Sequence, residues 1–286
     1  MPAVITSMKD DHLVTLRALR TRAGREQAGA CLLEGPALIG QALDAGAALR
    51  FAIRVAGAED PLAGRLARAE VPLLDVRESV LRQVLHTARP VHWVAVAELA
   101  AAAGDEVAYG DSAVLLDGVL DPGNLGTIVR TAVGLGCYDV VCTAEDTDLT
   151  SRKVLDAARG AVLRARIRRF ASPAEAVTAL RERGFEVVAT SSHGRLPQAR
   201  TPLSGGPVAL VVGNETEGVS AEVLAGADHV VRIPMAGAIE SLNVGVATGI
   251  SLYELRNLRA ERQALAALPE ADRTRLTTLL DQVRTD

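Results

Sequence analysis

The sequence predicts an α/β protein of two domains, and three observations support that prediction. Strand-like runs alternate with helical runs of roughly ten residues, which is typical of sheets covered by helices. The chain has 286 residues, more than a single domain usually contains. The apolar run Pro207–Val212 is of the kind found where a strand of a parallel sheet is buried on both faces.

The composition limits the classes of function. Apolar residues make up 49% of the chain and charged residues 23%, which excludes a wholly disordered protein. No apolar run reaches the roughly 18 residues of a membrane span, and the N-terminus lacks a signal-peptide core. The cysteines show no metal-ligand spacing, so we expect no metal site and free thiols in a reducing cytoplasm. A net charge of −4 argues against a uniformly basic nucleic-acid-binding surface.

Residues 8–99 form the first predicted domain, a small α/β unit. Its expected elements are the helix His12–Thr21, the strand Cys31–Leu33, the helix Pro36–Ala45, the strand Phe51–Val55, the helix Leu62–Ala69, the strand Pro72–Leu74, the helix Val80–His86 and the strand Val91–Val96. A cluster of arginines near its start has no acid within it: Arg17, Arg20, Arg22 and Arg25. Because arginine suits bidentate phosphate contacts, RNA binding by this cluster is one interpretation, and a solvated charged surface is the other.

Residues 100–111 are rich in alanine, contain a helix-breaking glycine and form the expected linker. Residues 112–260 form the second predicted domain. Its expected elements are the strand Ala113–Asp117, the helix Thr127–Leu135, the strand Val140–Cys142, the helix Arg152–Ala158, the strand Ala165–Arg169, the helix Ala174–Arg183, the strands Glu186–Thr190, Pro207–Val212 and Val230–Ile233, and the helix Ser241–Arg259. Residues 261–286 are expected to form a helical extension that packs on its own chain or on a partner.

The last helix of the second domain carries few bulky side chains. Ser241 is expected to cap it, because a serine hydroxyl accepts a free backbone N–H of the first turn. Gly245 and Gly249 each cost about 1 kcal/mol relative to alanine inside a helix, so they indicate a close backbone approach. A ligand, a second subunit or another part of the chain could lie against them, and a simple packed internal helix explains the same residues.

Three loops follow predicted buried strands: Asp117–Gly126, Gly213–Gly218 and Pro234–Asn243. Ligands of open α/β sheets bind at the carboxyl ends of the strands, where glycines allow close approach and helix N-termini present N–H groups. Each loop carries an asparagine; Arg130 follows the first loop, and Glu215 and Ser241 lie in the other two. We therefore expect a ligand site at this edge.

A second group of arginines lies within Ser151–Arg169, a stretch of seven cations and one acid. Arg164, Arg166 and Arg168 alternate with other residues, which places three guanidinium groups on one face of a strand. Since no acid lies beside them in the sequence, we favour contact with RNA phosphates over a solvated charged face.

The three loops resemble the motifs of a known family. Asp121-Pro-Gly-Asn124-x-Gly-x-Ile-Val-Arg130-Thr-Ala, Gly213-Asn-Glu215-x-x-Gly218, and Ile233-Pro-Met235 with Ser241-Leu-Asn243-Val are similar to motifs 1, 2 and 3 of the SpoU/TrmH RNA 2′-O-ribose methyltransferases. The first domain resembles the ribosomal-protein-like substrate-binding domain of the ribosomal RNA members, through Leu16–Arg20, Arg25-Glu and Leu33-Glu-Gly35. The resemblance implies a SPOUT parallel-sheet domain with a deep trefoil knot, assembled as a homodimer.

The resemblance also implies the cofactor and the residues of the site. S-adenosyl-L-methionine (AdoMet) is the expected cofactor, and its expected contacts are Gly213, Ile233, Leu242, Met235 and, from a neighbouring strand end, Ser191. The expected catalytic residues are Arg130, Asn124, Glu215, Ser241 and Asn243. Because arginine stays protonated in proteins, we favour an electrostatic or phosphate-orienting role for Arg130 over that of a base. An ion pair between Glu215 and Arg130 that only joins two motifs is the structural alternative.

The prediction is therefore an AdoMet-dependent RNA ribose 2′-O-methyltransferase of the cytoplasm, acting on large-subunit ribosomal RNA. Housekeeping modification and protection against an antibiotic both stay open. A non-catalytic RNA-binding or ribosome-assembly protein, a tRNA 2′-O-methyltransferase and a small-molecule methyltransferase are the competing interpretations. Retention of Asn124, Arg130, Glu215, Ser241 and Asn243 together argues against a protein that only binds.

Overall fold

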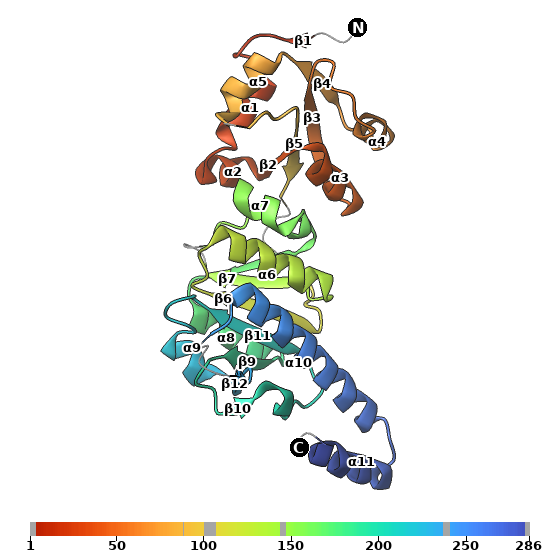
Figure 1. The fold of residues 1–286 in the computed structure, drawn as a ribbon, viewed down its shortest axis with the longest axis vertical. Coiled ribbons are helices and arrows are strands. Elements are labelled where there is room, and N and C mark those ends of the chain that lie inside the picture. Colours follow the sequence, from red (N-terminus) through yellow and green to blue (C-terminus); the bar gives the residue numbers. More distant parts are fainter. Residues whose placement is uncertain (1–3, 88, 100–106, 144–146, 237–240, 284–286) are drawn as a thin grey trace. The chain divides into compact units, whose positions relative to one another are not determined.

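The protein was examined as a computed structural model that describes residues 4–87, 89–99, 107–143, 147–236 and 241–283. The chain divides into two compact units (Figure 1). Unit 1 comprises Met1–Ala101 and Asp148–Ala165, and unit 2 comprises Ala102–Thr147 and Arg166–Asp286. Most of the predicted linker, residues 100–106, lies outside the described residues. In the part of the chain that is described, no helix is long and apolar enough to cross a membrane.

Unit 1 is built on a mixed five-stranded sheet with the order β1-β4-β3-β5-β2. The strands are β1 (Val4–Ile5), β2 (Ala30–Glu34), β3 (Leu49–Val55), β4 (Leu73–Val76) and β5 (Trp93–Glu98). β5 runs antiparallel to both β2 and β3, whereas β1, β4 and β3 pair in parallel. The small α/β domain predicted from the sequence is confirmed.

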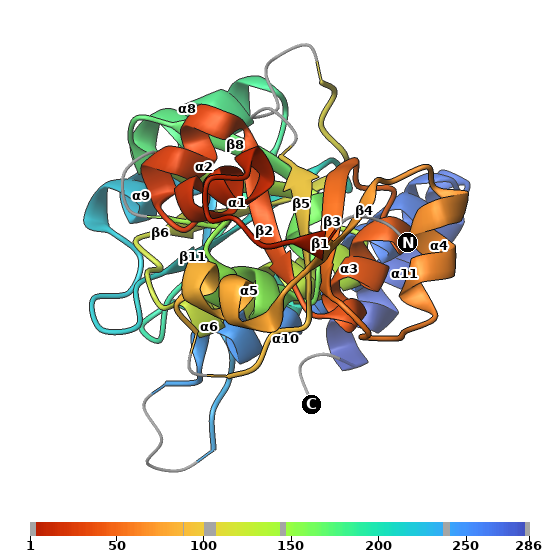
Figure 2. The same cartoon turned by 90° about the horizontal axis from the view of Figure 1, so that it is seen from above.

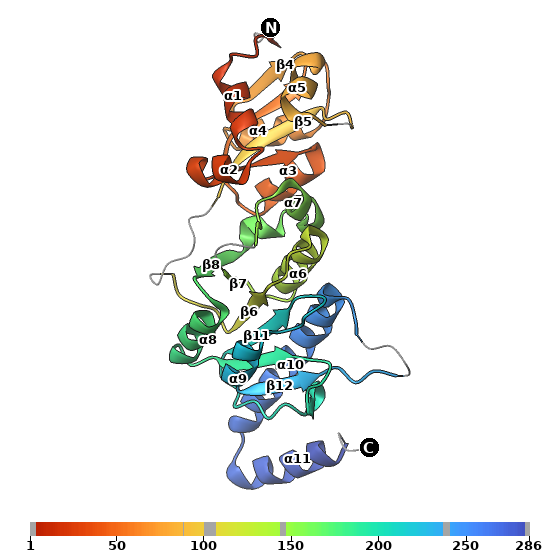
Figure 3. The ribbon, with the colours of Figure 1, turned by 90° about the vertical axis from the view of Figure 1, so that its left-hand side faces the viewer.

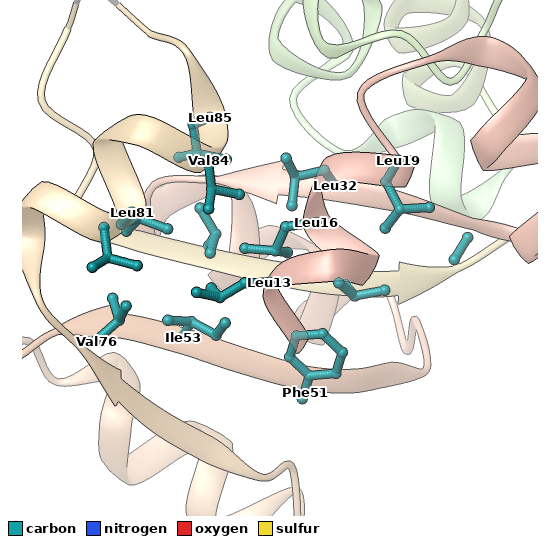
Figure 4. Close-up of a cluster of buried hydrophobic side chains, with 14 residues drawn as sticks. Leu13, Leu16, Leu19, Leu32, Phe51, Ile53, Val76, Leu81, Val84 and Leu85 are labelled. Atoms are coloured by element: carbon teal, nitrogen blue, oxygen red, sulfur yellow. The ribbon is translucent and has the colours of Figure 1, made fainter. Parts of the chain in front are cut away.

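Helices cover both faces of this sheet. They are α1 (Asp11–Ala18), α2 (Arg22–Ala28), α3 (Pro36–Asp44), α4 (Leu62–Arg68) and α5 (Glu78–Leu85). α1 and α5 lie on one face, and α3 and α4 lie on the other (Figures 1 and 2). Leu13 and Leu16 of α1 point between α5 and the strands, where they pack with Ile53 and Leu81 (Figure 4). Helical spacing puts Leu13 and Leu16 on one face, which explains why α1 docks there.

Unit 1 also includes Asp148–Ala165, which connects two strands of the other unit. This crossover forms α7 (Arg152–Ala158) and a 3₁₀ turn, η1 (Ala161–Arg164), and α7 packs on β2. Its apolar side chains Leu149, Val154 and Leu155 are buried. The chain therefore passes between the units at the crossover as well as at the linker.

Arg25 holds the beginning of the crossover. Its Nη2 donates to Asp148 Oδ2 at 2.5 Å, its Nε donates to Thr150 Oγ1 at 3.0 Å, and its Nη1 donates to the Leu19 carbonyl at 3.1 Å. Only 7% of the Arg25 side chain is exposed. The prediction that Arg25 contacts RNA is therefore wrong, because an acid that lies far away in the sequence has bound this guanidinium inside the protein.

Unit 2 is built on a seven-stranded parallel sheet with the order β10-β12-β9-β11-β6-β7-β8. The strands are β6 (Ser112–Asp117), β7 (Asp139–Thr143), β8 (Arg166–Phe170), β9 (Glu186–Thr190), β10 (Leu196–Pro197), β11 (Val208–Gly213) and β12 (His229–Arg232). Every residue of the central strand β11 is buried, as its apolar sequence predicts.

The helices of unit 2 are α6 (Pro122–Gly134), α8 (Pro173–Glu182), α9 (Ala221–Gly226), α10 (Val244–Ala266) and α11 (Glu270–Val283), with a 3₁₀ turn η2 (Gln198–Arg200). α8 and α9 lie on one face of the sheet, and α6 and α10 lie on the other (Figure 3). The predicted border at residue 260 falls inside α10, so the extension begins as a continuation of that helix.

The glycines of α10 lie against α6. A Cβ atom added to Gly245 would lie 2.8 Å from Thr127 Cγ2, and one added to Gly249 would lie 3.2 Å from Thr131 Cγ2. The close approach expected from the sequence is therefore to another part of the same chain. Glycine has a lower helix propensity than alanine, but at both positions its lack of a side chain allows the two helices to pack closely.

Asn243, and not Ser241, caps α10. Asn243 Oδ1 accepts from the backbone N–H groups of Gly245 at 2.9 Å and Val246 at 3.3 Å. The predicted helix start was therefore too early. Asparagine and serine are about equally good caps, so the sequence offered two candidates and no local reason to choose.

The arginines of β8 are held by an acid on the neighbouring strand. The carboxylate of Asp139 on β7 is fully buried and accepts from Arg166 Nη2 at 2.6 Å and from Arg168 Nε at 3.1 Å. Arg168 is 2% exposed and lies over the Tyr109 ring, so its predicted contact with RNA is wrong. Arg164 belongs to η1 and does not share a strand face with them. Burial would raise the pKa of Asp139, but the hydrogen bonds from Arg166, the Gly110 N–H and Arg168 outweigh it and hold that pKa below its ordinary value.

Replacing Asp139 with asparagine is expected to lower the free energy of unfolding by about 3 kcal/mol or more, because it leaves the buried guanidinium group of Arg168 without its carboxylate. The lowered pKa makes this stabilisation complete above pH 3.8, and it disappears as the pH falls through the folded-state value. The stability difference between wild type and Asp139→Asn should therefore narrow in acid, as measured by urea denaturation at several pH values. Glu182→Gln, at an exposed glutamate of α8, is the control and should change stability by less than about 0.5 kcal/mol. Equal stability of Asp139→Asn and wild type at neutral pH would contradict the proposed role of the ion pair.

Candidate active site

The candidate site lies at the carboxyl ends of four neighbouring parallel strands, β12, β9, β11 and β6. β6 and β11 end in register, with Asp117 opposite Gly213. Asn214, just after β11, donates from Nδ2 to the carbonyl of Gly118, just after β6, at 2.9 Å. The Asp117 carboxylate accepts from the Ser220 N–H at 2.7 Å. Two of the three predicted loops are therefore held together at this edge, as the parallel topology requires.

A chain of hydrogen bonds joins all three loops. Asn243 Nδ2 donates to Asn124 Oδ1 at 2.9 Å, and Asn124 Nδ2 donates to Glu215 Oε1 at 2.6 Å. Asn124 is itself fixed, because its backbone N–H donates to the N-cap Asp121 at 2.8 Å. Three of the five predicted catalytic residues thus form one network, although they are far apart in the sequence.

The loop 213–218 is shaped by its own backbone and by Asn214. The backbone N–H groups of Asn214 and Gly218 donate to each other's carbonyls at 3.0 and 2.9 Å. Asn214 Oδ1 accepts from the N–H groups of Thr216 and Glu217 at 2.8 and 3.1 Å. A Cβ atom on Gly213 would lie 2.1 Å from the Gly218 carbonyl carbon, so only glycine fits there. This tight loop presents Glu215 to Asn124.

Arg130 lies on the exposed face of α6. Among the residues that the structure describes, it has no hydrogen bond or ion pair. The predicted ion pair with Glu215 is therefore not formed, and Glu215 is held by Asn124 instead. Ser241 is exposed and lies two residues before the cap of α10. The site thus combines a hydrogen-bonded network that includes the Glu215 carboxylate with a cation, Arg130, that has no partner among the described residues.

The predicted cofactor residues follow the same strands. Gly213 ends β11, Ile233 and Met235 follow β12, and Ser191 follows β9. The Ser191 N–H donates to the Val231 carbonyl at 2.9 Å, which joins the ends of β9 and β12. Leu242 directly precedes the cap of α10 and is half-buried. These positions lie around one edge of the sheet, where backbone groups and apolar side chains could hold a nucleoside, and their contacts with a cofactor stay a prediction.

The remaining predicted RNA-binding arginines of unit 1 lie at its surface, and several of them bind a carbonyl or a carboxylate there. Arg17 and Arg20 are exposed and donate to the carbonyls of Met8 and Val84. Arg22 pairs with Glu26 one helical turn away, and Arg164 is exposed on η1. Their contact with RNA stays a prediction. In unit 2, Arg166 is partly exposed but bound to Asp139.

Sequence reasoning missed two residues that shape the site and its support. Asn214 was treated as part of a motif, although it organises the loop and joins it to β6; its position directly after a buried strand was the available signal. Asp139 was overlooked because its partners lie on the next strand of the sheet. The cysteines supply no nucleophile, since burial raises the pKa of Cys31 and of Cys137 to about 12.

Comparison with known families gives two matches. The profile of the SpoU rRNA Methylase family matches residues 111–253. The profile of the MRM3-like substrate binding domain matches residues 11–95. The first match contains the whole hydrogen-bonded network, and the second contains most of the sheet of unit 1.

Individual proteins show the same likeness over most of the chain. An uncharacterized tRNA/rRNA methyltransferase of Synechocystis sp. is 33% identical over 89% of this chain and 93% of its own length. The 23S rRNA (guanosine(2553)-2′-O)-methyltransferase RlmP of Bacillus subtilis is 29% identical over 88% of this chain and 98% of its own. The SpoU methyltransferase AviRb from Streptomyces viridochromogenes, solved with AdoMet, superposes with a TM-score of 0.76, 29% identity and coverage of 88% and 99%.

Replacing Gly213 with alanine is expected to lower the free energy of unfolding by about 1–3 kcal/mol, the usual cost of overpacking, because the new Cβ atom collides with the backbone at Gly218. Chemical denaturation measures this change. Gly134→Ala is the matched control, since a Cβ atom there meets nothing within 4 Å. A Gly213→Ala protein as stable as the control would show that the loop is not tightly closed.

Proposed function

Because this chain belongs to the SpoU rRNA methylase family, we propose that it transfers a methyl group from AdoMet to a ribose 2′-hydroxyl of RNA. Large-subunit ribosomal RNA is the proposed substrate. The observation that carries the proposal is the Asn243–Asn124–Glu215 network at the strand ends, with Arg130 exposed on the same helix, α6, that carries Asn124. RlmP, which is named for 2′-O-methylation of 23S rRNA, supports the substrate class.

The residues present at the strand ends fit AdoMet. The loop 213–218 is exposed from Glu215 to Gly218, where backbone groups are accessible, whereas Gly213 is buried and lets the loop close tightly on itself. Ile233, Met235 and Leu242 supply apolar surface, and Ser191 supplies a hydroxyl. When bound, AdoMet supplies an activated methyl group on a sulfonium. The protein then has to bring a hydroxyl into line with that group and assist the loss of its proton.

Arg130 is proposed to assist this proton loss electrostatically. Arginine stays protonated in proteins, so it acts as a fixed positive charge and not as a base. A cation close to the developing alkoxide lowers the free energy of that anion, and its donors orient a phosphate of the RNA backbone. Arg130 is suited to this role because no carboxylate among the described residues neutralises it.

The asparagines and Glu215 are proposed to position the substrate. Each side chain in the network is held by another, so rotation of any one of them would break a hydrogen bond. Glu215 keeps acceptor capacity for a substrate hydroxyl, since only one of its oxygens is engaged by Asn124. Ser241 is close to the cap of α10 and is proposed to act with this group.

A trefoil knot and a homodimer complete the proposal. β12 pairs with β9, whereas α10 packs on α6 and β11, so the two elements on either side of residues 233–243 lie against different strands of the sheet. α10 exposes an apolar stripe, Val246 at 51%, Ile250 at 42% and Tyr253 at 53%, on one helical face. We assign this stripe to the interface with a second copy. The cytoplasm is the proposed location, since ribosomal RNA is the proposed substrate.

Arg130→Ala is expected to lower the rate of methyl transfer to ribosomal RNA by at least about a hundredfold, because it removes a preorganised charge from the reacting centre. Calorimetric titration of AdoMet should give nearly the wild-type Kd, since Arg130 is not assigned to the cofactor. Arg275→Ala, which changes an exposed arginine of α11, should retain full activity. Full activity in Arg130→Ala would refute the assigned role.

Ile250→Glu is expected to convert a dimer to monomers, because it buries a charge in the apolar stripe of α10. Sedimentation velocity at micromolar protein measures the change. Val14→Glu places the same charge on an exposed residue of unit 1 and should leave the dimer intact. A dimer of unchanged affinity in Ile250→Glu would place the interface elsewhere.

A further inference from the structure

A hollow of about 470 Å³ opens in unit 1, next to the N-terminus of α3. Its volume lies in the range of roughly 300–1,000 Å³ that is typical of small-molecule sites. Pro36, His92 and Trp93 supply flat walls, and Glu34, Arg89 and Arg152 supply charged groups. Neither the catalytic network nor the packing of the unit 1 core uses this hollow.

Glu34 is the unusual residue of this hollow. Its side chain is 7% exposed, and no group among the described residues makes a hydrogen bond to its Oε2. Arg152 Nη2 lies 2.7 Å from that oxygen but outside hydrogen-bond geometry. A buried carboxylate oxygen with unused acceptor capacity costs free energy unless a donor reaches it. Since this oxygen is covered by the protein and faces Arg152, a ligand with N–H groups would supply that donor by displacing the Arg152 guanidinium.

The charges of the hollow select against a phosphate as the group that enters it. Its acids are Glu34, Glu59, Asp60 and Asp156, whereas its cations are Arg89 and Arg152. Carboxylates repel an anion and attract N–H donors. The entering group should therefore carry N–H donors and no negative charge, and the ring side chains of the walls favour a planar group such as a nucleobase turned out of its stack.

We propose that this hollow binds an unstacked guanine base of the RNA substrate, read by Glu34. This inference rests on the proposed function, because it takes RNA as the substrate. Guanine presents two adjacent N–H donors, which match the two oxygens of a carboxylate, and a neighbouring carbonyl, which can accept from Arg152. Adenine has an unprotonated ring nitrogen at the position of the first donor. That nitrogen is an acceptor and would face the Glu34 carboxylate, which is also an acceptor. His92 and Pro36 offer surfaces for the face of the base, and Arg89 offers a cation for the adjoining phosphate.

The walls of the pocket come from two parts of the chain. Glu34 lies in the segment that matches the substrate-binding domain, whereas Arg152 and Asp156 lie on α7, inside the methylase match. A base in the hollow would contact both parts. Arg152 already joins them, through its contact with Glu34.

Trp93 allows a direct test, because it is the single tryptophan of the chain and lines this hollow. Tryptophan fluorescence of the full-length protein, without AdoMet, would be recorded during titration with GMP, IMP and AMP. GMP should change the fluorescence saturably, and AMP should bind at least about tenfold more weakly, the discrimination that a bidentate contact supplies. IMP, which lacks the 2-amino group, should fall between them.

Glu34→Gln should reduce GMP affinity about tenfold and remove the preference over AMP, because the amide N–H₂ opposes the donors of guanine. Glu26→Gln, an equal change of charge on exposed α2, should behave as wild type. Circular dichroism would verify that both variants are folded. The comparison of GMP with IMP and AMP on wild type needs no variant, so it tests the proposal even if Glu34→Gln does not fold.

Three outcomes would overturn the proposal: no response to GMP at several millimolar, equal responses to GMP and AMP, or an equal response to inorganic phosphate. A response to spermidine in place of GMP would assign the acidic pocket to a cation. The titration needs neither AdoMet nor catalysis. If GMP does not bind but methyl transfer is intact, this inference fails and the proposed function stands. If GMP binds but no methyl transfer occurs, the proposed function fails and this inference stands.

Discussion

The close approach of α10 to α6 is the contact on which the site depends. Gly245 and Gly249 lack the side chains that would separate the two helices, so Thr127 and Thr131 lie directly against the α10 backbone. Asn243, at the start of α10, can then reach Asn124 in the first turn of α6. A bulkier helix would move Asn243 away from Asn124 and leave Glu215 linked to one loop only. Packing between two helices thus sets the geometry of a polar site.

Arginine has two different roles in this chain, and the sequence does not distinguish them. Arg25 and Arg168 are buried and bind the carboxylates of Asp148 and Asp139, whereas Arg130 is exposed without a partner among the described residues. Each buried pair joins residues that neighbour one another only in the folded protein. The absence of acids near Arg25 and Arg168 in the sequence therefore predicted phosphate binding, although the fold places a carboxylate beside each of them. Burial of a charge requires a partner, and that partner here comes from another element.

The sequence predicted the two α/β sheets and most strands of unit 2, because buried parallel strands are strongly apolar and their loops carry recognisable motifs. It also predicted that Asn124, Glu215 and Asn243 lie at one edge of the sheet, because the carboxyl ends of parallel strands meet at that edge. It could not choose between Ser241 and Asn243 as the cap, because both residue types accept the same N–H groups. Nor could it show that α7 packs on β2, because the burial of Val154 and Leu155 is compatible with either sheet.

The crossover Asp148–Ala165 has a consequence for how such proteins can be recombined. A domain attached by one linker can be exchanged by a single cut, but here an inner segment of the methylase match completes the neighbouring unit. A chimera cut only between residues 100 and 111 would strip α7 of the surface that covers Leu149, Val154 and Leu155, and would leave Asp148 without Arg25. We therefore expect the two units to have changed together. A functional exchange of unit 1 would have to include the crossover Asp148–Ala165.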